Sequence, residues 1–82
     1  MRKYENEIGG QLQQVVCNKC KKELQLENGY LKEGCFYADF SFGYFSSRDG
    51  MRHKFDLCEE CYNQMIAGFM IPIEEVAENE LL

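Results

Sequence analysis

The chain has 82 residues, of which 45% are hydrophobic, and it carries a formal net charge of −5. The core of a single domain of this length only just offsets the conformational entropy lost on folding, so we expect an additional constraint. The acidic balance disfavours nucleic acid as a partner, because phosphate backbones attract basic proteins. No run of about 18 apolar residues occurs, so the sequence predicts no membrane-spanning helix and no membrane partner.

Residues 1–14 are polar, contain a Gly9-Gly10 break and show no hydrophobic period. We expect a flexible N-terminal arm or an edge strand here, a folded domain over residues 15–72 and an acidic C-terminal tail over residues 73–82. The first residues lack the apolar run of a signal peptide, which predicts a cytoplasmic protein with reduced thiols.

Val15 and Val16 lead into Cys17-x-x-Cys20, which predicts a strand that enters a tight turn, or knuckle. Backbone N–H groups after the first cysteine of such a turn point at the thiolates and stabilise their charge. Lys21 follows the second cysteine, where glycine is common because it tolerates positive φ. Lysine adopts that conformation only at an energetic cost.

Asn28-Gly29 is the first of two turn signals that predict β-hairpins. The dipeptide favours a two-residue loop, because both positions tolerate positive φ. Such a loop places Leu26 opposite Leu31.

Asp49-Gly50 is the second turn signal. A two-residue loop there pairs Tyr44 with Phe55 and Phe42 with Leu57. Before this turn, apolar and polar residues alternate as in a half-buried strand, with the apolar positions at Phe36, Ala38, Phe40, Phe42 and Tyr44. This aromatic face requires an element that covers it.

A helix is predicted over residues 58–69. Its apolar stripe has helical spacing and consists of Cys58, Cys61, Tyr62, Met65, Ile66 and Phe69. Asp56, with Glu59 three residues later, predicts a capping box at the start, and Pro72 predicts the end. We expect this helix to lie across the aromatic face, and the tail that follows to form a short helix or an extended strand.

Five cysteines occur, and four of them form two Cys-x-x-Cys pairs, namely Cys17, Cys20, Cys58 and Cys61. Two thiolates at this spacing bind one ion from a single turn, and two such turns complete the tetrahedral shell that zinc prefers. The odd count and the tight pairing argue against a disulfide scaffold. We therefore predict one structural Zn²⁺ per chain, bound by these cysteines in a zinc-binding domain over residues 15–72. A rubredoxin-like iron site and disulfide or redox chemistry are the alternatives.

A knuckle pair, then strands, then a cysteine pair at a helix start resembles the treble-clef zinc finger, over roughly Val15 to Phe69. The resemblance implies an α+β fold, in which zinc staples antiparallel β-hairpins to one C-terminal α-helix. The stretch from Phe55 to Tyr62, Phe-Asp-Leu-Cys-x-x-Cys-Tyr, is also similar to small uncharacterised bacterial zinc-binding proteins. Treble clefs serve nucleic-acid, protein and enzymatic roles alike, so the resemblance implies no particular activity.

Cys35 and His53 are the two remaining candidates for a site. An isolated cysteine packs as a small hydrophobe, so we expect Cys35 to be a buried free thiol. We expect His53 to lie at the hairpin edge opposite Ser46. The alternatives are that His53 joins the metal shell or hydrogen-bonds a thiolate, or that it serves Cys35 as a base for nucleophilic chemistry.

Zinc enclosed by four cysteines has no open position for water, and no catalytic constellation is visible, which predicts a non-enzymatic protein without a small-molecule substrate. We expect a structural module that contacts a protein partner or forms a homodimer, with Tyr37 and Phe45 as candidate contacts. One alternative is a regulator that binds nucleic acid through Lys19, Lys21, Lys22, Arg48, Arg52, His53 and Lys54. Another is a thiol sensor from which oxidation releases zinc.

Overall fold

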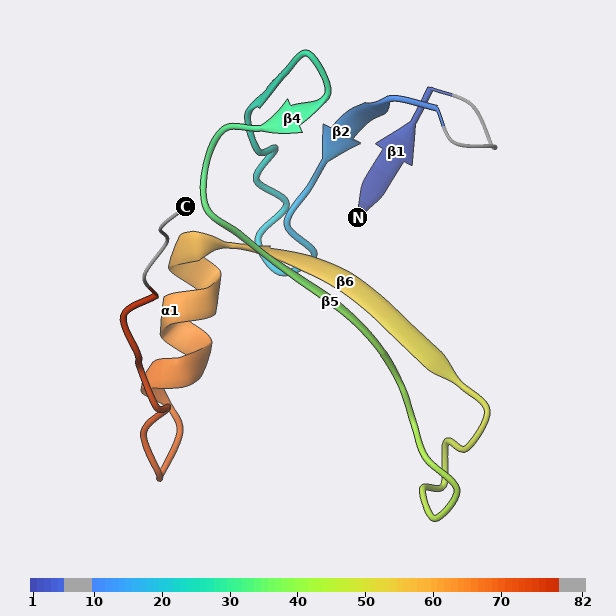
Figure 1. The fold of residues 1–82 in the computed structure, drawn as a ribbon, viewed down its shortest axis with the longest axis vertical. Coiled ribbons are helices and arrows are strands. Elements are labelled where there is room, and N and C mark those ends of the chain that lie inside the picture. The colour runs from blue at the N-terminus through green and yellow to red at the C-terminus, as the bar shows by residue number, and fades with distance from the viewer. Residues whose placement is uncertain (6–9, 79–82) are drawn as a thin grey trace.

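The computed structural model describes residues 1–5 and 10–78. Its elements in chain order (Figure 1) are β1 (Arg2–Tyr4), β2 (Leu12–Val15), β3 (Leu26–Glu27), β4 (Tyr30–Leu31), β5 (Cys35–Ser41), β6 (Arg52–Cys58) and α1 (Glu59–Ala67). The strands form three two-stranded antiparallel sheets, β1-β2, β3-β4 and β5-β6. The predicted α+β class, with antiparallel hairpins and one helix, is confirmed.

The N-terminal hairpin delivers the chain to the first cysteine pair. Its register places Arg2 opposite Val15 and Tyr4 opposite Leu12, and Val15 is fully buried. The described residues do not include Gly9 of the Gly9-Gly10 break or residues 79–82 of the acidic tail. The described tail residues, 73–78, lie in neither a helix nor a strand, contrary to both expectations.

The β3-β4 hairpin has the predicted register, with Leu26 opposite Leu31. Asn28 and Gly29 both take positive φ, 53° and 83°, as a two-residue loop requires. A Cβ atom at Gly29 would approach the Cγ atom of Gln11 to 2.7 Å, so the N-terminal hairpin also packs against this turn.

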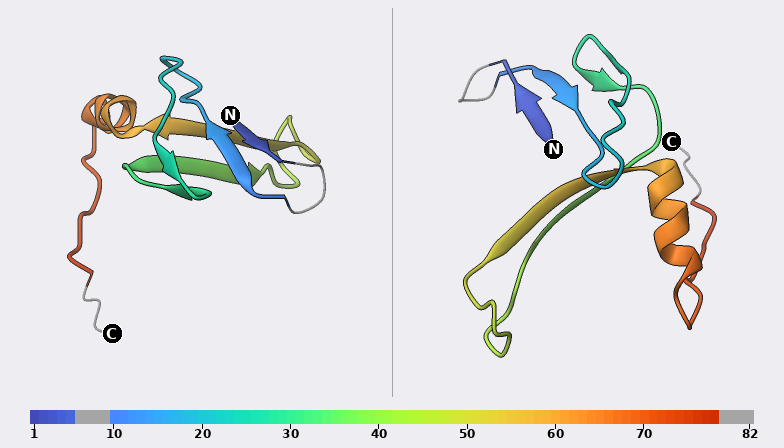
Figure 2. Two further views of the ribbon diagram at one scale, coloured as in Figure 1. Left: turned by 90° about the horizontal axis from the view of Figure 1, so that it is seen from above. Right: turned by 180° about the vertical axis from the view of Figure 1, so that it is seen from behind.

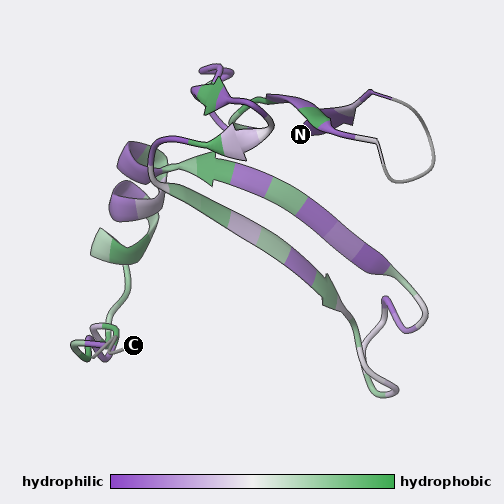
Figure 3. Cartoon of the chain, turned by 45° about the horizontal axis from the view of Figure 1, so that its top comes forward, coloured by the Kyte–Doolittle hydropathy of each residue, from purple (hydrophilic) through white to green (hydrophobic). Residues whose placement is uncertain are grey.

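The predicted register of the long β5-β6 hairpin is wrong by six residues. Leu57 lies opposite Phe36 rather than Phe42, and Phe55 lies opposite Ala38. An even shift keeps every side chain on its predicted face. Figure 3 shows the resulting alternation of apolar and polar residues along the hairpin.

The register differs because residues 42–51 form a long loop between the two strands. Three backbone hydrogen bonds close successive turns in this loop, from Ser46 to Gly43, from Asp49 to Ser46 and from Met51 to Arg48. Asp49-Gly50 is therefore the last of several turns rather than a two-residue connection. Tyr44, predicted to pair with Phe55, lies in this loop and is 79% exposed.

The predicted cap of the helix is also wrong. The N-cap of α1 is Cys58, which has an extended backbone and makes no side-chain cap hydrogen bond. Asp56 lies two residues earlier, inside β6, where its carboxylate has other partners. The helix ends before Gly68, ahead of Pro72. Among the described residues no helix is long and apolar enough to cross a membrane.

α1 packs on the base of the long hairpin rather than across it. The rings of Phe36 and Tyr62 lie 4.9 Å apart between their centroids. Figure 1 shows the helix and the hairpin diverging beyond this contact, and Met65 and Phe69 are 37% and 47% exposed. The expectation that the helix covers the aromatic face fails because the chain turns sharply at Cys58 and the helix axis leads away from the strands.

The core lies where the knuckle, the hairpin base and the helix meet. Its buried residues are Val15, Cys17, Leu24, Leu57, Cys58 and Cys61. Half of them are cysteines, so the centre of the core consists of thiols rather than of large apolar side chains. A core of this kind buries little hydrocarbon and gains correspondingly little from the hydrophobic effect.

Candidate metal centre

The first cysteine pair lies in a tight turn directly after β2. Within it, the N–H of Cys17 donates to the carbonyl of Lys22 at 2.9 Å, and the N–H of Lys21 donates to the carbonyl of Cys17 at 2.9 Å. Lys21 has the expected positive φ, at 70°. The sequence 17–22 therefore folds into a knuckle that turns both thiols to one side.

Lys21 offers a test of the knuckle geometry. We expect Lys21→Gly to raise the free energy of unfolding by about 1 kcal/mol, because an L-residue pays about that amount for positive φ. Lys19 does not have positive φ, so Lys19→Gly should lower stability instead. Denaturant unfolding of the metal-loaded proteins measures both changes, and a stability gain for Lys19→Gly alone would contradict this geometry.

The second cysteine pair spans the junction of β6 and α1. Cys58 is the last residue of β6 and the N-cap of α1, and Cys61 lies in the first helical turn. Unpaired N–H groups and the positive end of the helix dipole favour thiolates at this position. Figures 1 and 2 show the knuckle beside this junction.

The sulfur atoms of Cys17, Cys20, Cys58 and Cys61 converge on one point. All four Sγ atoms lie within 4.8 Å of one another, and the Sγ atoms of Cys20 and Cys58 are 3.8 Å apart. Sulfur atoms bound to zinc at about 2.3 Å stand about 3.8 Å apart along the edges of a tetrahedron. A disulfide would require about 2.05 Å. The donor set therefore fits a tetrahedral metal and does not fit a disulfide pair.

The surroundings of Cys17 and Cys61 shift the pKa values of these two thiols in opposite directions. Burial alone would raise the pKa of Cys17, but the backbone N–H groups of Cys20, Cys58 and Lys19 outweigh it and lower the pKa to about 6. Two causes raise the pKa of Cys61 to about 12: burial is the larger, and hydrogen bonds between its thiol and the neighbouring cysteine sulfurs add to it. Cys17 therefore loses its proton at a lower pH than Cys61. Binding of a metal that needs four thiolates would release the remaining protons.

Hydrogen bonds hold the two halves of the site together independently of any metal. The N–H of Asn18 donates to the carbonyl of Asp56 at 2.8 Å, and the N–H of Asp56 donates to Oδ1 of Asn18 at 2.9 Å. Asn18 directly follows Cys17, and Asp56 precedes Cys58 by two residues. This pair of bonds therefore sets the distance between the knuckle and the second cysteine pair.

The carboxylate of Asp56 is the main polar group beside the thiols, and sequence reasoning missed this role. It is 1% exposed, and it accepts bonds from the Met1 ammonium at 3.0 Å and from Nε of Arg2 at 2.9 Å. Burial alone would raise the pKa of Asp56, but these two cations outweigh it and lower the pKa below its usual range. The signal in the sequence was an acidic residue within an alternating strand, on the face opposite Phe55 and Leu57.

Cys35 lies outside the group of four thiols, although it pairs with Cys58 across the hairpin. It is a free, half-buried thiol whose Sγ atom donates to the Asp56 carboxylate at 3.5 Å. Burial, and then the Asp56 carboxylate, raise the pKa of Cys35, so this thiol stays protonated.

His53 lies at the far end of β6 and outside the thiol group. It faces Phe40 rather than Ser46, which corrects the predicted neighbour. Its ring also packs edge-on against Phe42, with centroids 4.8 Å apart. The histidine therefore belongs to the aromatic surface of the hairpin.

Comparison of the chain with models of protein families, with curated proteins and with solved structures finds no match in any of the three. The similarity to small bacterial proteins expected from the sequence thus gains no support. The chemistry of the site follows from its own geometry, which is four cysteine sulfurs arranged to hold one metal ion at the centre of the core.

Proposed function

We propose that this protein is a structural zinc-binding module that presents a surface to another protein or to itself. The observation that carries the proposal is the convergence of four Sγ atoms within 4.8 Å. Thiolates are soft ligands, and a tetrahedral set of four favours zinc, with iron as the alternative metal.

The small core supports a structural role for the metal. The main core cluster holds six buried residues in the described chain, and three of them are cysteines of the proposed site. Zinc bound to such a site contributes about 10 kcal/mol or more to folding. That free energy is comparable to the whole stability of a typical domain.

A treble-clef-like arrangement is part of this proposal. The knuckle supplies Cys17 and Cys20, the hairpin end supplies Cys58, and the first turn of α1 supplies Cys61. A shell of four thiolates leaves no coordination position for water or substrate, which supports a non-enzymatic role.

The surface favours protein over nucleic acid as the partner. Large apolar side chains are exposed on the hairpin, its loop and the segment after α1, including Phe40, Tyr44, Phe45, Met70 and Ile71. Two of the cations considered for nucleic acid are paired with carboxylates, Lys22 with Glu33 at 3.0 Å and Arg52 with Asp39 at 2.6 Å. An apolar surface with locally neutralised cations suits contact with another protein.

Native mass spectrometry and metal analysis of protein purified under reducing conditions test this function. We expect one zinc ion per 9.6 kDa chain. Cys17→Ser should lose the metal, whereas Cys35→Ser should keep it, because Cys35 lies outside the four-thiol group. Protein that carries no metal, or that binds zinc equally well after Cys17→Ser, would refute the proposal.

A further inference from the structure

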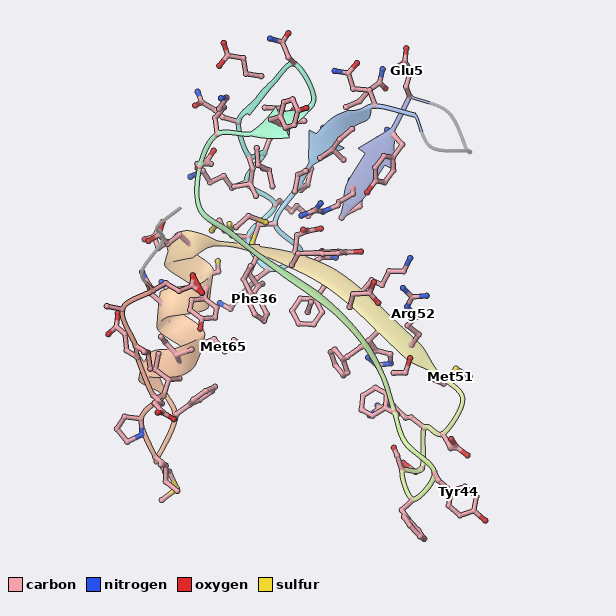
Figure 4. All side chains as sticks on the ribbon, viewed as in Figure 1. Glu5, Phe36, Tyr44, Met51, Arg52 and Met65 are labelled. Carbon is pink, nitrogen blue, oxygen red and sulfur yellow. The ribbon has the colours of Figure 1, made fainter. Side chains whose placement is uncertain are left out.

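The β5-β6 hairpin extends beyond the elements that support its base. A two-stranded sheet is marginally stable in water unless a third strand or a helix packs on it. α1 covers one face near Phe36, and β1 covers the other face near Tyr37. Farther out, Phe40 packs on Phe42 with ring centroids 5.2 Å apart, and Phe40 is still 43% exposed. Figure 4 shows Tyr44 and Met51 at the far end of the hairpin, away from Phe36 and the helix. The outer half of the hairpin therefore needs a partner.

The outer edge of β6 is protected against pairing. At its base, the N–H and C=O groups of Asp56 already bond Asn18. Its distal half carries the exposed cation Lys54, whereas the charge of Arg52 is paired with Asp39. Charged residues on an edge strand repel a second copy of the same strand.

The outer edge of β5 is open and electrically neutral. Its only charged residue is Asp39, whose carboxylate accepts two hydrogen bonds from Arg52, at 2.6 and 2.7 Å. The N–H of Phe42 donates to the carbonyl of Met51, so even-numbered positions direct their backbone groups toward β6. The odd-numbered positions, including Tyr37, therefore direct their N–H and C=O groups outward.

We infer that β5 pairs with β5 of a second copy of this chain in an antiparallel dimer, with Ala38 on the two-fold axis. The pairing joins two hairpins into one four-stranded sheet. Both α1 helices lie on the same face of this sheet, because the axis is perpendicular to it. The inference rests on the proposed function, since the metal centre anchors the base of each hairpin.

The register follows from side-chain size and charge. A pair on the axis at an even-numbered position is not hydrogen-bonded, and its Cα atoms approach to about 4.5 Å, which suits alanine. Ala38 on the axis places Phe36 opposite Phe40 of the second copy, and Tyr37 opposite its Asp39. An axis at Asp39 would oppose two carboxylates. An axis at Phe40 would pair only residues 39–41 of β5, whereas an axis at Ala38, the middle residue of β5, pairs all seven.

Size-exclusion chromatography with light scattering measures the mass of the metal-loaded protein in solution and so tests this dimer. We expect twice the 9.6 kDa chain mass. Asp39→Pro removes an outward N–H group and should halve the measured mass. Lys54→Pro is the matched control, because Lys54 is the cross-strand partner of Asp39 and its N–H points outward from β6. Asp39→Asn is a second control, because it keeps the N–H group. The Lys54→Pro and Asp39→Asn proteins should both remain dimers.

Amide hydrogen exchange of the unaltered protein gives a second test that needs no substitution. The amides of Tyr37 and Asp39 should exchange more slowly as protein concentration rises, whereas the amide of Lys54 should not change. A monomeric mass, a larger assembly or unprotected Tyr37 and Asp39 amides would overturn the dimer. Zinc content measured on the same samples separates the two proposals, because a zinc-bound monomer refutes only the dimer and a zinc-free chain refutes the proposed function.

Discussion

Replacing Cys58 by serine is expected to abolish the cooperative unfolding transition of the metal-loaded protein. Cys58 is buried, supplies one of the four converging sulfurs and connects β6 to α1. Zinc contributes about 10 kcal/mol or more in sites of this kind, and domains are stable by about 5–15 kcal/mol. Loss of the metal should therefore leave the chain largely unfolded, which circular dichroism during heating will detect.

The matched control for this prediction is Cys35→Ser. Cys35 lies directly opposite Cys58 in the hairpin, so the same chemical change is made one strand away. Its sulfur faces Asp56, and a serine hydroxyl at this position can still donate to that carboxylate. The control should therefore keep its cooperative melt. A Cys58→Ser protein that melts like the control would show that the metal is not needed for folding.

Asp56→Ala is expected to lower the free energy of unfolding by about 3 kcal/mol, because the change removes the buried carboxylate that bonds the half-buried Arg2 guanidinium and the exposed Met1 ammonium. The carboxylate binds the Met1 ammonium and the Arg2 guanidinium, and it is almost fully buried. Truncation releases β1 from β6 at the point where the knuckle is attached. Urea unfolding of the metal-loaded protein measures the loss.

Asp39→Ala provides the comparison for Asp56→Ala. Asp39 also lies on the long hairpin and also pairs with an arginine, Arg52, but that pair is open to solvent. Exposed ion pairs contribute little to stability, because water and salt screen them. We therefore expect Asp39→Ala to lower the free energy of unfolding by only a small fraction of the loss caused by Asp56→Ala. Equal losses for the two variants would contradict a central role for the Asp56 carboxylate.

The sequence could predict features that depend on short, local spacing. Two Cys-x-x-Cys pairs indicated which four of the five cysteines come together, because this spacing lets two thiols bind from one turn. Asn28-Gly29 fixed the pairing of Leu26 with Leu31, because a two-residue loop allows one register. Alternation along residues 36–40 identified the correct face of β5.

Features set by longer-range contacts could not be predicted in this way. Asp49-Gly50 resembles a hairpin turn, but hydrogen bonds within residues 42–51 create a longer loop and shift the strands by six residues. Asp56 fits a capping pattern by sequence, yet the Met1 ammonium and Arg2 bind it from more than 50 residues away. The direction of α1 depends on the turn at Cys58, which the apolar stripe of the helix does not encode.

X-ray absorption at the zinc edge of the reduced, metal-loaded protein determines whether all four cysteines bind one ion. We predict a single shell of four sulfur atoms at about 2.3 Å from the metal. The same shell should appear in Cys35→Ser. A shell that includes nitrogen or oxygen, or that contains fewer than four sulfurs, would contradict the convergence of Cys17, Cys20, Cys58 and Cys61 on one ion.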